Sequence, residues 1–279
     1  MAVRSTARRL WLGMSTLLGC RRGFFIPYRY AHRLLPPGGR PAYQPIEQLF
    51  EAAGGIFTAQ LRALDEYADA LRAIGRRPAP APRWDQDWFP RLDAAITYAI
   101  VRRHRPMRIV EVGSGHSTRF LARAVADGRL ATRLTAIDPE PRASIKGLAA
   151  EFLRNRVQEV PENVFHELQP GDILFIDSSH QMKPGSDVDL LINRIIPHLP
   201  SGARVHLHDI FLPDEYPQEW AWRRYNEQNF IKTLLPRYAV EFSSHWITSR
   251  RPDLLQRGVL GRLPLLAGAL ESSLWLRKN

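Results

Sequence analysis

The sequence predicts an α/β protein with a doubly wound, mostly parallel sheet, a terminal antiparallel hairpin and an N-terminal helical extension. Three observations predict this class. From residue 107 onward, short apolar runs alternate with segments of helical spacing, which indicates parallel strands covered by helices. A Gly-x-Gly turn follows the first apolar run, as expected where a strand tip meets a ligand. The last two apolar runs stand too close together for a crossover helix and therefore predict a hairpin.

Length and composition are those of an ordinary globular protein. The chain has 279 residues, enough for one large domain with extensions. Hydrophobic residues make up 44% and charged residues 24% of it. Cys20 is the only cysteine in the sequence, which excludes an internal disulfide framework and a cysteine-rich zinc site. We therefore expect a reducing, cytoplasmic compartment.

The net charge of +11 is concentrated at the two ends of the chain. Residues 1–46 hold eight arginines and no acidic residue, residues 249–279 carry a net charge of +4, and residues 47–248 carry −1. A nucleic-acid-binding domain has its basic surface on the folded body. The distribution therefore argues against a nucleic-acid partner.

The N-terminal segment is apolar and basic. Residues 10–19 form an apolar run that is too short to span a bilayer, which takes about 20 residues. This run next to Arg8 and Arg9 fits a surface-lying amphipathic helix, with peripheral contact of residues 1–40 to the inner face of a membrane. Alternatives are an export signal ending at LLGC, or packing of the chain ends as a cap or a contact in a homo-oligomer. Residues 21–41 predict an ordered arm rather than a helix.

Pro-rich residues 76–83 give the best domain boundary. We expect an N-terminal extension over 1–83, a ligand-binding domain over 84–250 and an apolar, basic tail over 251–279. Helical spacing covers residues 46–75, with an interruption expected at Gly54-Gly55.

The remaining elements follow from the alternating pattern. A helix over 84–106 should end before Pro106. Strands are predicted at 108–112, 133–138, 156–160, 172–177 and 203–209, and helices at 116–127, 142–154, 161–168, 186–198 and 218–235. The hairpin is predicted to join 238–242 to 245–249.

The turn after the first strand indicates a nucleoside cofactor. Gly113 and Gly115 allow close approach of the backbone, and Asp138 at the next strand end can accept both ribose hydroxyls. A dinucleotide fingerprint requires a third glycine where this chain has Thr118. Glu111 beside the turn suits the cationic S-adenosylmethionine better than a pyrophosphate. A tight strand–helix turn with no ligand would explain the glycines but not Asp138.

Four segments, VEVGSGHST, AIDPEPR, DILFIDSSH and PSGARVHLHDIF, resemble successive motifs of the class I S-adenosylmethionine-dependent methyltransferases, family 24 type. The resemblance covers residues 107–250. It implies the Rossmann-like methyltransferase fold and an adenine region near Gln158 and Glu159. The cofactor contacts that it implies are Glu111, Gly113, Gly115, Ser117 and Asp138.

A second group of polar residues follows the fourth and fifth predicted strands: Asp177, His180, His208 and Asp209. Carboxylates and imidazoles at neighbouring strand tips can bind a divalent cation, which would lower the pKa of a substrate hydroxyl. A neutral histidine nearby could take the proton.

Asp-x-x-His followed by a polar pair resembles the metal-dependent sugar O-methyltransferases of macrolide biosynthesis. The resemblance implies Asp177 and Asp209 as metal ligands, with Asp177 and His180 as catalytic residues and His180 as the base. We expect His208 to complete the ligand set for Mg²⁺ or Mn²⁺. His208 stands where that subgroup has Glu. Without a metal, Asp177 would be a hydrogen-bond acceptor, His180 a helix cap and His208 a packed strand residue. His206 is expected to face away from His208.

These patterns predict methyl transfer from S-adenosylmethionine to a small-molecule acceptor, at a hydroxyl oxygen. The aromatic segment 211–228 follows the fifth strand, where Trp220, Trp222, Tyr225 and Asn226 could line the acceptor pocket. One alternative is a non-catalytic module of the same fold bound to a membrane surface. The other is a nicotinamide-dependent oxidoreductase, which lacks support from a Tyr-x-x-x-Lys pair.

Overall fold

The computed structural model describes residues 2–20, 28–35 and 38–279. The chain divides into two compact units, residues 1–39 and 40–279. The first unit contains helix α1 (Ala2–Leu17) and a 3-10 turn at Ala31–Arg33. Much of the arm predicted over 21–41, including Arg21 and Arg22, lies outside the described residues. Within the described residues, no helix combines the length and apolar character that a membrane span requires.

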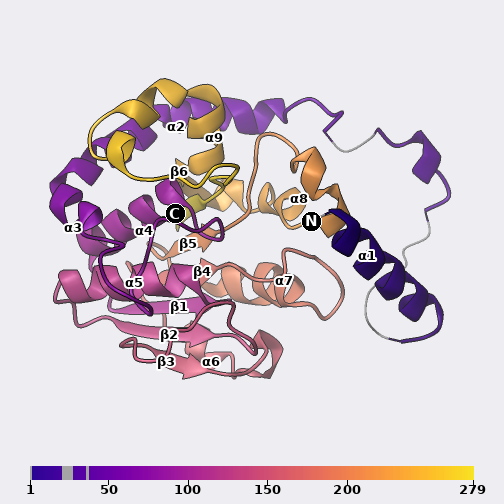
Figure 1. Ribbon diagram of the computed structural model, residues 1–279, viewed down its shortest axis with the longest axis horizontal. Coiled ribbons are helices and arrows are strands. Elements are labelled where there is room, and N and C mark those ends of the chain that lie inside the picture. Colours follow the sequence, from indigo (N-terminus) through magenta and orange to yellow (C-terminus); the bar gives the residue numbers. More distant parts are fainter. Residues whose placement is uncertain (1, 21–27, 36–37) are drawn as a thin grey trace. The chain divides into compact units, whose positions relative to one another are not determined.

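The second unit is built on a seven-stranded sheet in the order β3-β2-β1-β4-β5-β7-β6 (Figure 1). Its strands are β1 (Arg108–Val112), β2 (Arg133–Ile137), β3 (Glu151–Leu153), β4 (Ile173–Ile176), β5 (Arg204–Leu207), β6 (Tyr238–Ser243) and β7 (Leu274–Lys278). The first five run parallel, and β7 is antiparallel to both β5 and β6. Strand order reverses between β1 and β4, where ligands bind in sheets of this type.

Helices pack against this sheet and against one another. They are α2 (Gln44–Ala63), α3 (Ala68–Arg72), α4 (Arg91–His104), α5 (His116–Asp127), α6 (Asn163–His166), α7 (Asp187–Leu190), α8 (Gln228–Ile231) and α9 (Ser244–Arg250). Helices α4 and α5 contact each other, and α2 packs against β6. The largest fully buried side chains include Trp275, Phe89 and Phe175, which surround His206 at the centre of the sheet. The class predicted from the sequence, a mostly parallel sheet ending in antiparallel strands, is confirmed.

The antiparallel pair is not the predicted hairpin. Residues 244–250 form α9, because Ser243 accepts a hydrogen bond from the Trp246 backbone N–H and caps a helix where the second strand was expected. The partner of β6 comes from the far end of the chain, residues 274–278, and inserts between β5 and β6. Residues predicted to be a tail therefore complete the sheet.

The third strand also differs from the prediction. Residues 151–153 form β3 inside the segment predicted as a helix, while the predicted strand 156–160 contains a 3-10 turn at Val157–Glu159. Gly147 has a φ of +89°, which breaks helical continuity ahead of the strand. Apolar runs this short do not distinguish a strand from a turn by periodicity.

Three helix predictions also differ from the structure, in where the helix is interrupted or where it begins. Helix α2 continues through Gly54-Gly55, where the absence of a side chain at Gly54 lets the Trp246 ring approach. The segment predicted as one helix over 218–235 is instead a 3-10 turn at Gln218–Arg223, helix α8 and an intervening loop. Helix α4 begins only at Arg91, since the side chain of Gln86 pairs with the backbone of Phe89 in a turn.

Candidate cofactor cleft and active site

A cavity of about 350 Å³ opens at the carboxyl ends of β1, β2 and β4. Gly113, Asp138, Gln158 and Asp177, all singled out in the sequence, lie in its wall. Sequence patterns did not single out other wall residues, including Arg142, Ser178, Ser179 and Asp187. The site of strand-order reversal therefore carries a cavity lined by polar side chains.

The two turn glycines are required by the backbone itself. Gly113 has a φ of +88°, and a Cβ there would stand 1.8 Å from the carbonyl oxygen of Asp177. Gly115, with a φ of +157°, begins α5 and donates its N–H to the Thr118 hydroxyl at 2.9 Å. Thr118 thus closes the helix start at the position of the third glycine of the dinucleotide fingerprint. Gly115 itself is outside the cavity wall.

Asp138 is held at the mouth of the cavity by three hydrogen bonds. One carboxylate oxygen accepts from the backbone N–H and the hydroxyl of Ser114, at 2.7 and 3.0 Å. The other oxygen accepts from the Glu140 N–H at 2.7 Å. These bonds fix the carboxylate at the end of β2, where an acid can accept hydrogen bonds from vicinal hydroxyls.

Glu111 and Ser117 lie behind the cavity wall. Glu111 is fully buried, and one of its oxygens accepts a hydrogen bond from the Ser117 hydroxyl at 2.6 Å. Its Oε2 has no hydrogen-bond partner among the described residues. Burial raises the pKa of Glu111 to about 8, although the hydrogen bond from Ser117 opposes the rise. An uncompensated carboxylate oxygen at this depth is a ready acceptor for a cationic group.

Glu159 is not part of the cavity wall, although it pairs with Arg156, which is. Of the two residues expected near an adenine ring, only Gln158 therefore lies in the cavity wall.

Asp187, another residue of the wall, accepts hydrogen bonds from the backbone N–H and the hydroxyl of Ser179, at 2.8 and 2.5 Å.

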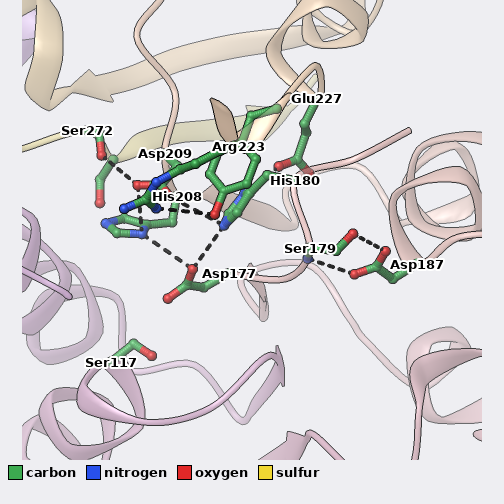
Figure 2. A network of polar contacts seen from close by, with 12 residues as sticks. Ser117, Asp177, Ser179, His180, Asp187, His208, Asp209, Arg223, Glu227 and Ser272 are labelled. Carbon is green, nitrogen blue, oxygen red and sulfur yellow. Dashed lines mark hydrogen bonds and ion pairs between the residues drawn. The ribbon is translucent and has the colours of Figure 1, made fainter. Parts of the chain in front are cut away.

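A cluster of charged side chains lies beside the cavity, with Asp177 common to both (Figure 2). Oδ1 of Asp177 lies 3.4 Å from His180 Nε2 and 3.4 Å from His208 Nδ1. Asp209 approaches the same two nitrogens, at 3.4 and 3.5 Å. All four residues predicted from the strand tips are therefore brought together.

Each histidine of the cluster is also held by a buried acid that the sequence analysis missed. Nδ1 of His180 lies 2.9 Å from Glu227, and Nε2 of His208 lies 3.3 Å from Asp93. Asp93 also accepts the backbone N–H groups of Ser272 and Ser273 at the start of β7. An acid within the apolar stretch LDAAITYAI was the one available signal for Asp93; no comparable pattern marks Glu227.

The backbone around the cluster is strained in two places. His180 and Asp209 both have positive φ, +58° and +55°, a conformation that side chains other than glycine adopt at a cost. The His180 carbonyl accepts the N–H groups of Asn226 and Glu227, which tie its loop to the segment before α8. Long-range contacts thus fix the imidazole in its strained position.

Charge pairing decides the protonation of the cluster. Burial by itself would lower the pKa of His180 and His208, but the neighbouring carboxylates outweigh it and hold both pKa values well above the usual range. Against the opposing effect of burial, the two histidines hold the pKa of Asp177 well below its usual value. The surrounding carboxylates therefore favour the protonated form of both imidazoles.

The metal centre predicted at Asp177, His208 and Asp209 is not supported by this arrangement. Across residues 2–20, 28–35 and 38–279, no three or more His, Cys, Asp or Glu side chains form a group that could hold a metal ion. The imidazole nitrogens face carboxylate oxygens as ion pairs instead. The expectation for His206 was wrong: residues two apart share a strand face, and its ring stacks 6.1 Å from that of His208.

Aromatic residues of the 211–228 segment form one side of the cluster. The ring of Tyr225 lies 4.7 Å from that of His180. Arg223 lies over the Trp220 ring at 4.1 Å and donates to the Tyr225 hydroxyl at 3.2 Å (Figure 2). Trp222 is half exposed. Asn226 bonds the backbone of Met182 and so positions a loop.

Comparisons with known proteins agree with this architecture. Residues 110–210 match the family described as a methyltransferase domain. A methyltransferase of Podospora anserina with SAH bound is 15% identical, with a TM-score of 0.44, over 92% of this chain and 99% of that one. The O-methyltransferase TomG of Streptomyces achromogenes, in complex with SAM, is 18% identical, with a TM-score of 0.42, over 78% and 89%. No curated protein sequence matches the chain.

Proposed function

We propose that this chain, whose residues 110–210 match the family described as a methyltransferase domain, is a class I S-adenosylmethionine-dependent enzyme that methylates a hydroxyl oxygen of a small molecule. One observation carries the proposal: Asp177 lines the cofactor cavity and also contacts His180, so a proton acceptor stands next to the cofactor. An acceptor whose oxygen is bound beside Asp177 would lie within reach of His180 Nε2.

The cavity supports the cofactor assignment through its charges. Asp138 would accept the ribose hydroxyls, and the carboxylate of Glu111, buried behind the cavity wall, would stabilise the cationic cofactor through its charge. The cationic sulfonium would favour Asp177 and disfavour a neighbouring imidazolium. Cofactor binding would therefore lower the pKa of His180 towards the range in which a histidine accepts a proton.

The transfer itself requires little of the protein. An oxygen–carbon bond forms as the sulfur–carbon bond breaks, and the hydroxyl proton has to leave. In the proposed arrangement Glu227 holds His180 through Nδ1, so that Nε2 faces the acceptor and takes that proton. Alignment of the oxygen with the methyl group by the surrounding side chains provides the remaining acceleration.

The test is substitution of His180. Acceptors are first found by screening sugars, catechols and phenolic compounds for transfer of a radiolabelled methyl group. We expect His180→Ala to lower turnover by roughly 10²-fold or more, and calorimetry to show S-adenosylmethionine affinity within about threefold of wild type. His166→Ala, at an exposed histidine, is the matched control.

Two results would contradict the proposal. If His180→Ala abolishes cofactor binding, the residue holds the cofactor and not the proton. If NAD⁺ binds in calorimetry and S-adenosylmethionine does not, the oxidoreductase alternative replaces the proposal.

A divalent cation assisting the reaction is the second candidate, favoured by one observation. Each cluster histidine has one ring nitrogen held by a buried acid and the other turned towards Asp177 and Asp209. Proteins orient metal-ligating imidazoles in this way. The described side chains form no group that could hold a metal ion, so a cation expected at Asp177, His208 and Asp209 would first have to replace their ion pairs; it would then supply polarisation of the acceptor hydroxyl.

Chelation separates the two candidates. With metal assistance, dialysis against a chelator abolishes turnover, and Mg²⁺ or Mn²⁺ restores it. Unchanged turnover after chelation would leave proton transfer to His180 as the sole route. Affinity for S-adenosylmethionine, measured in parallel, shows that the cavity survives dialysis.

A further inference from the structure

Helix α1 presents an exposed apolar face of regular spacing. Leu10, Met14 and Leu17 follow one another at intervals of four and three residues, which places them on one side of a helix. Their side chains are 65%, 56% and 65% exposed, and Trp11 and Leu18 beside them are 56% and 78% exposed. Large apolar side chains gathered at this exposure mark an interaction surface.

The other side of α1 is less apolar and locally satisfied. Ser15 and Thr16 donate their hydroxyl hydrogens to the Leu12 carbonyl oxygen, at 3.0 and 2.7 Å. Leu12 and Thr16, four residues apart, lie opposite Leu10 and Met14 on the helical wheel and are only partly exposed. The helix is therefore amphipathic, and its apolar face is exposed to solvent instead of being packed in a core.

The charge of the N-terminal sequence indicates which partner this face would bind. Eight arginines and no acidic residue occupy positions 1–46, whereas residues 47–248 carry a net charge of −1. Arg8 is exposed next to the apolar positions. An anionic lipid bilayer offers both matching features: acyl chains that can contact the apolar side chains, and negatively charged headgroups that can pair with the arginines.

We propose that α1 lies in the plane of an anionic membrane surface, with Leu10, Met14 and Leu17 inserted between the acyl chains. The 16 residues of α1 are too few to cross a bilayer, so the helix rests at the interface. The methyltransferase domain is held at the membrane by this helix, where apolar acceptors concentrate. This inference is independent of the chemistry assigned to the cleft.

Flotation of the full chain with lipid vesicles tests the proposal. We expect the protein to float with phosphatidylcholine vesicles that contain phosphatidylglycerol at least tenfold more than with phosphatidylcholine alone. High salt should reduce flotation, because it screens the arginines. Substituting both Leu10→Glu and Met14→Glu should lower flotation to the phosphatidylcholine level.

The matched control places the same two charges on the other side of the helix. Leu12→Glu combined with Thr16→Glu changes the net charge equally and keeps the spacing of four residues, so it should retain most of the flotation. S-adenosylmethionine binding by calorimetry should be equal in all three proteins, which shows that residues 40–279 remain folded.

Three outcomes would overturn the proposal. The first is that the wild-type chain does not float with anionic vesicles. The second is that the two double variants lose flotation equally, which would assign binding to charge alone. The third is that light scattering shows a dimer that Leu10→Glu with Met14→Glu dissociates, which would make a second copy of the chain the occupant of the face.

Discussion

At the scale of single residues, the cleft depends on groups whose charge is set by burial. Glu111 has a fully buried side chain, one hydrogen-bonded oxygen and one without a partner in the described parts of the chain. Its pKa of about 8 means that it carries a proton at pH 7 in the ligand-free protein. If the proposed cationic cofactor binds in the cavity next to Glu111, its charge would favour release of that proton.

This proton release would make cofactor binding depend on pH. Between pH 6 and 8 the affinity for S-adenosylmethionine should rise, by at most about tenfold per pH unit, and level off above pH 8. Titration calorimetry in buffers of different ionisation enthalpy measures both the affinity and the released proton. Glu111→Gln should remove the dependence and Glu167→Gln, at an exposed acid, should keep it. A flat profile for the wild-type chain would rule out this role.

At the scale of elements, the last strand is the least expected and among the most buried. β7 pairs with β5 on one side and β6 on the other, and Trp275 within it is fully buried. The Trp275 ring packs 4.8 Å from His206 and 6.0 Å from Phe175. Asp93 of α4 holds the start of β7, so the same strand supports the histidine cluster.

Truncating the Trp275 side chain should therefore be costly, although the residue is five positions from the end of this sequence. We expect Trp275→Ala to lower the free energy of unfolding by about 3–5 kcal/mol in urea titrations, as for other large core residues. Leu266→Ala, at an exposed position in the preceding loop, should change it by less than about 0.5 kcal/mol. Equal effects at both positions would contradict the placement of β7.

At the scale of the whole molecule, buried neutral histidines set the response to acid. Burial, together with neighbouring arginines, lowers the pKa of His104 and of His116 to about 4. In the unfolded chain both titrate near 6.5. Between these pH values the two histidines bind more protons in the unfolded chain than in the folded protein, so their contribution to stability decreases as the pH falls from 6.5 to 4.

Each of these histidines should contribute on the order of 2 kcal/mol to that decrease, after allowance for partial exposure. Urea unfolding at a series of pH values from 7.5 to 4.5 measures it. His104→Gln should flatten the profile, and His166→Gln, at an exposed histidine, should not. Identical pH profiles for the wild type and His104→Gln would refute the assignment.

The sequence by itself determined four of the five parallel strands and several strand-end residues that line the cavity or belong to the histidine cluster. The strands at 108–112, 133–137, 173–176 and 204–207 were predicted because local runs of apolar residues specify buried parallel strands. Gly113, Asp138, Asp177 and His180 were predicted because strand ends of a parallel sheet meet at one edge.

Only the tertiary structure decided the rest. Three sets of contacts join residues that are 47 to 115 positions apart: the pairing of β7 with β5, the contact of Asp93 with His208, and the contact of Glu227 with His180. No local period encodes such contacts, since they depend on how whole elements pack. The same contacts hold the histidines as charged partners of Asp177 and Asp209, which a pattern of residue types at strand ends cannot specify.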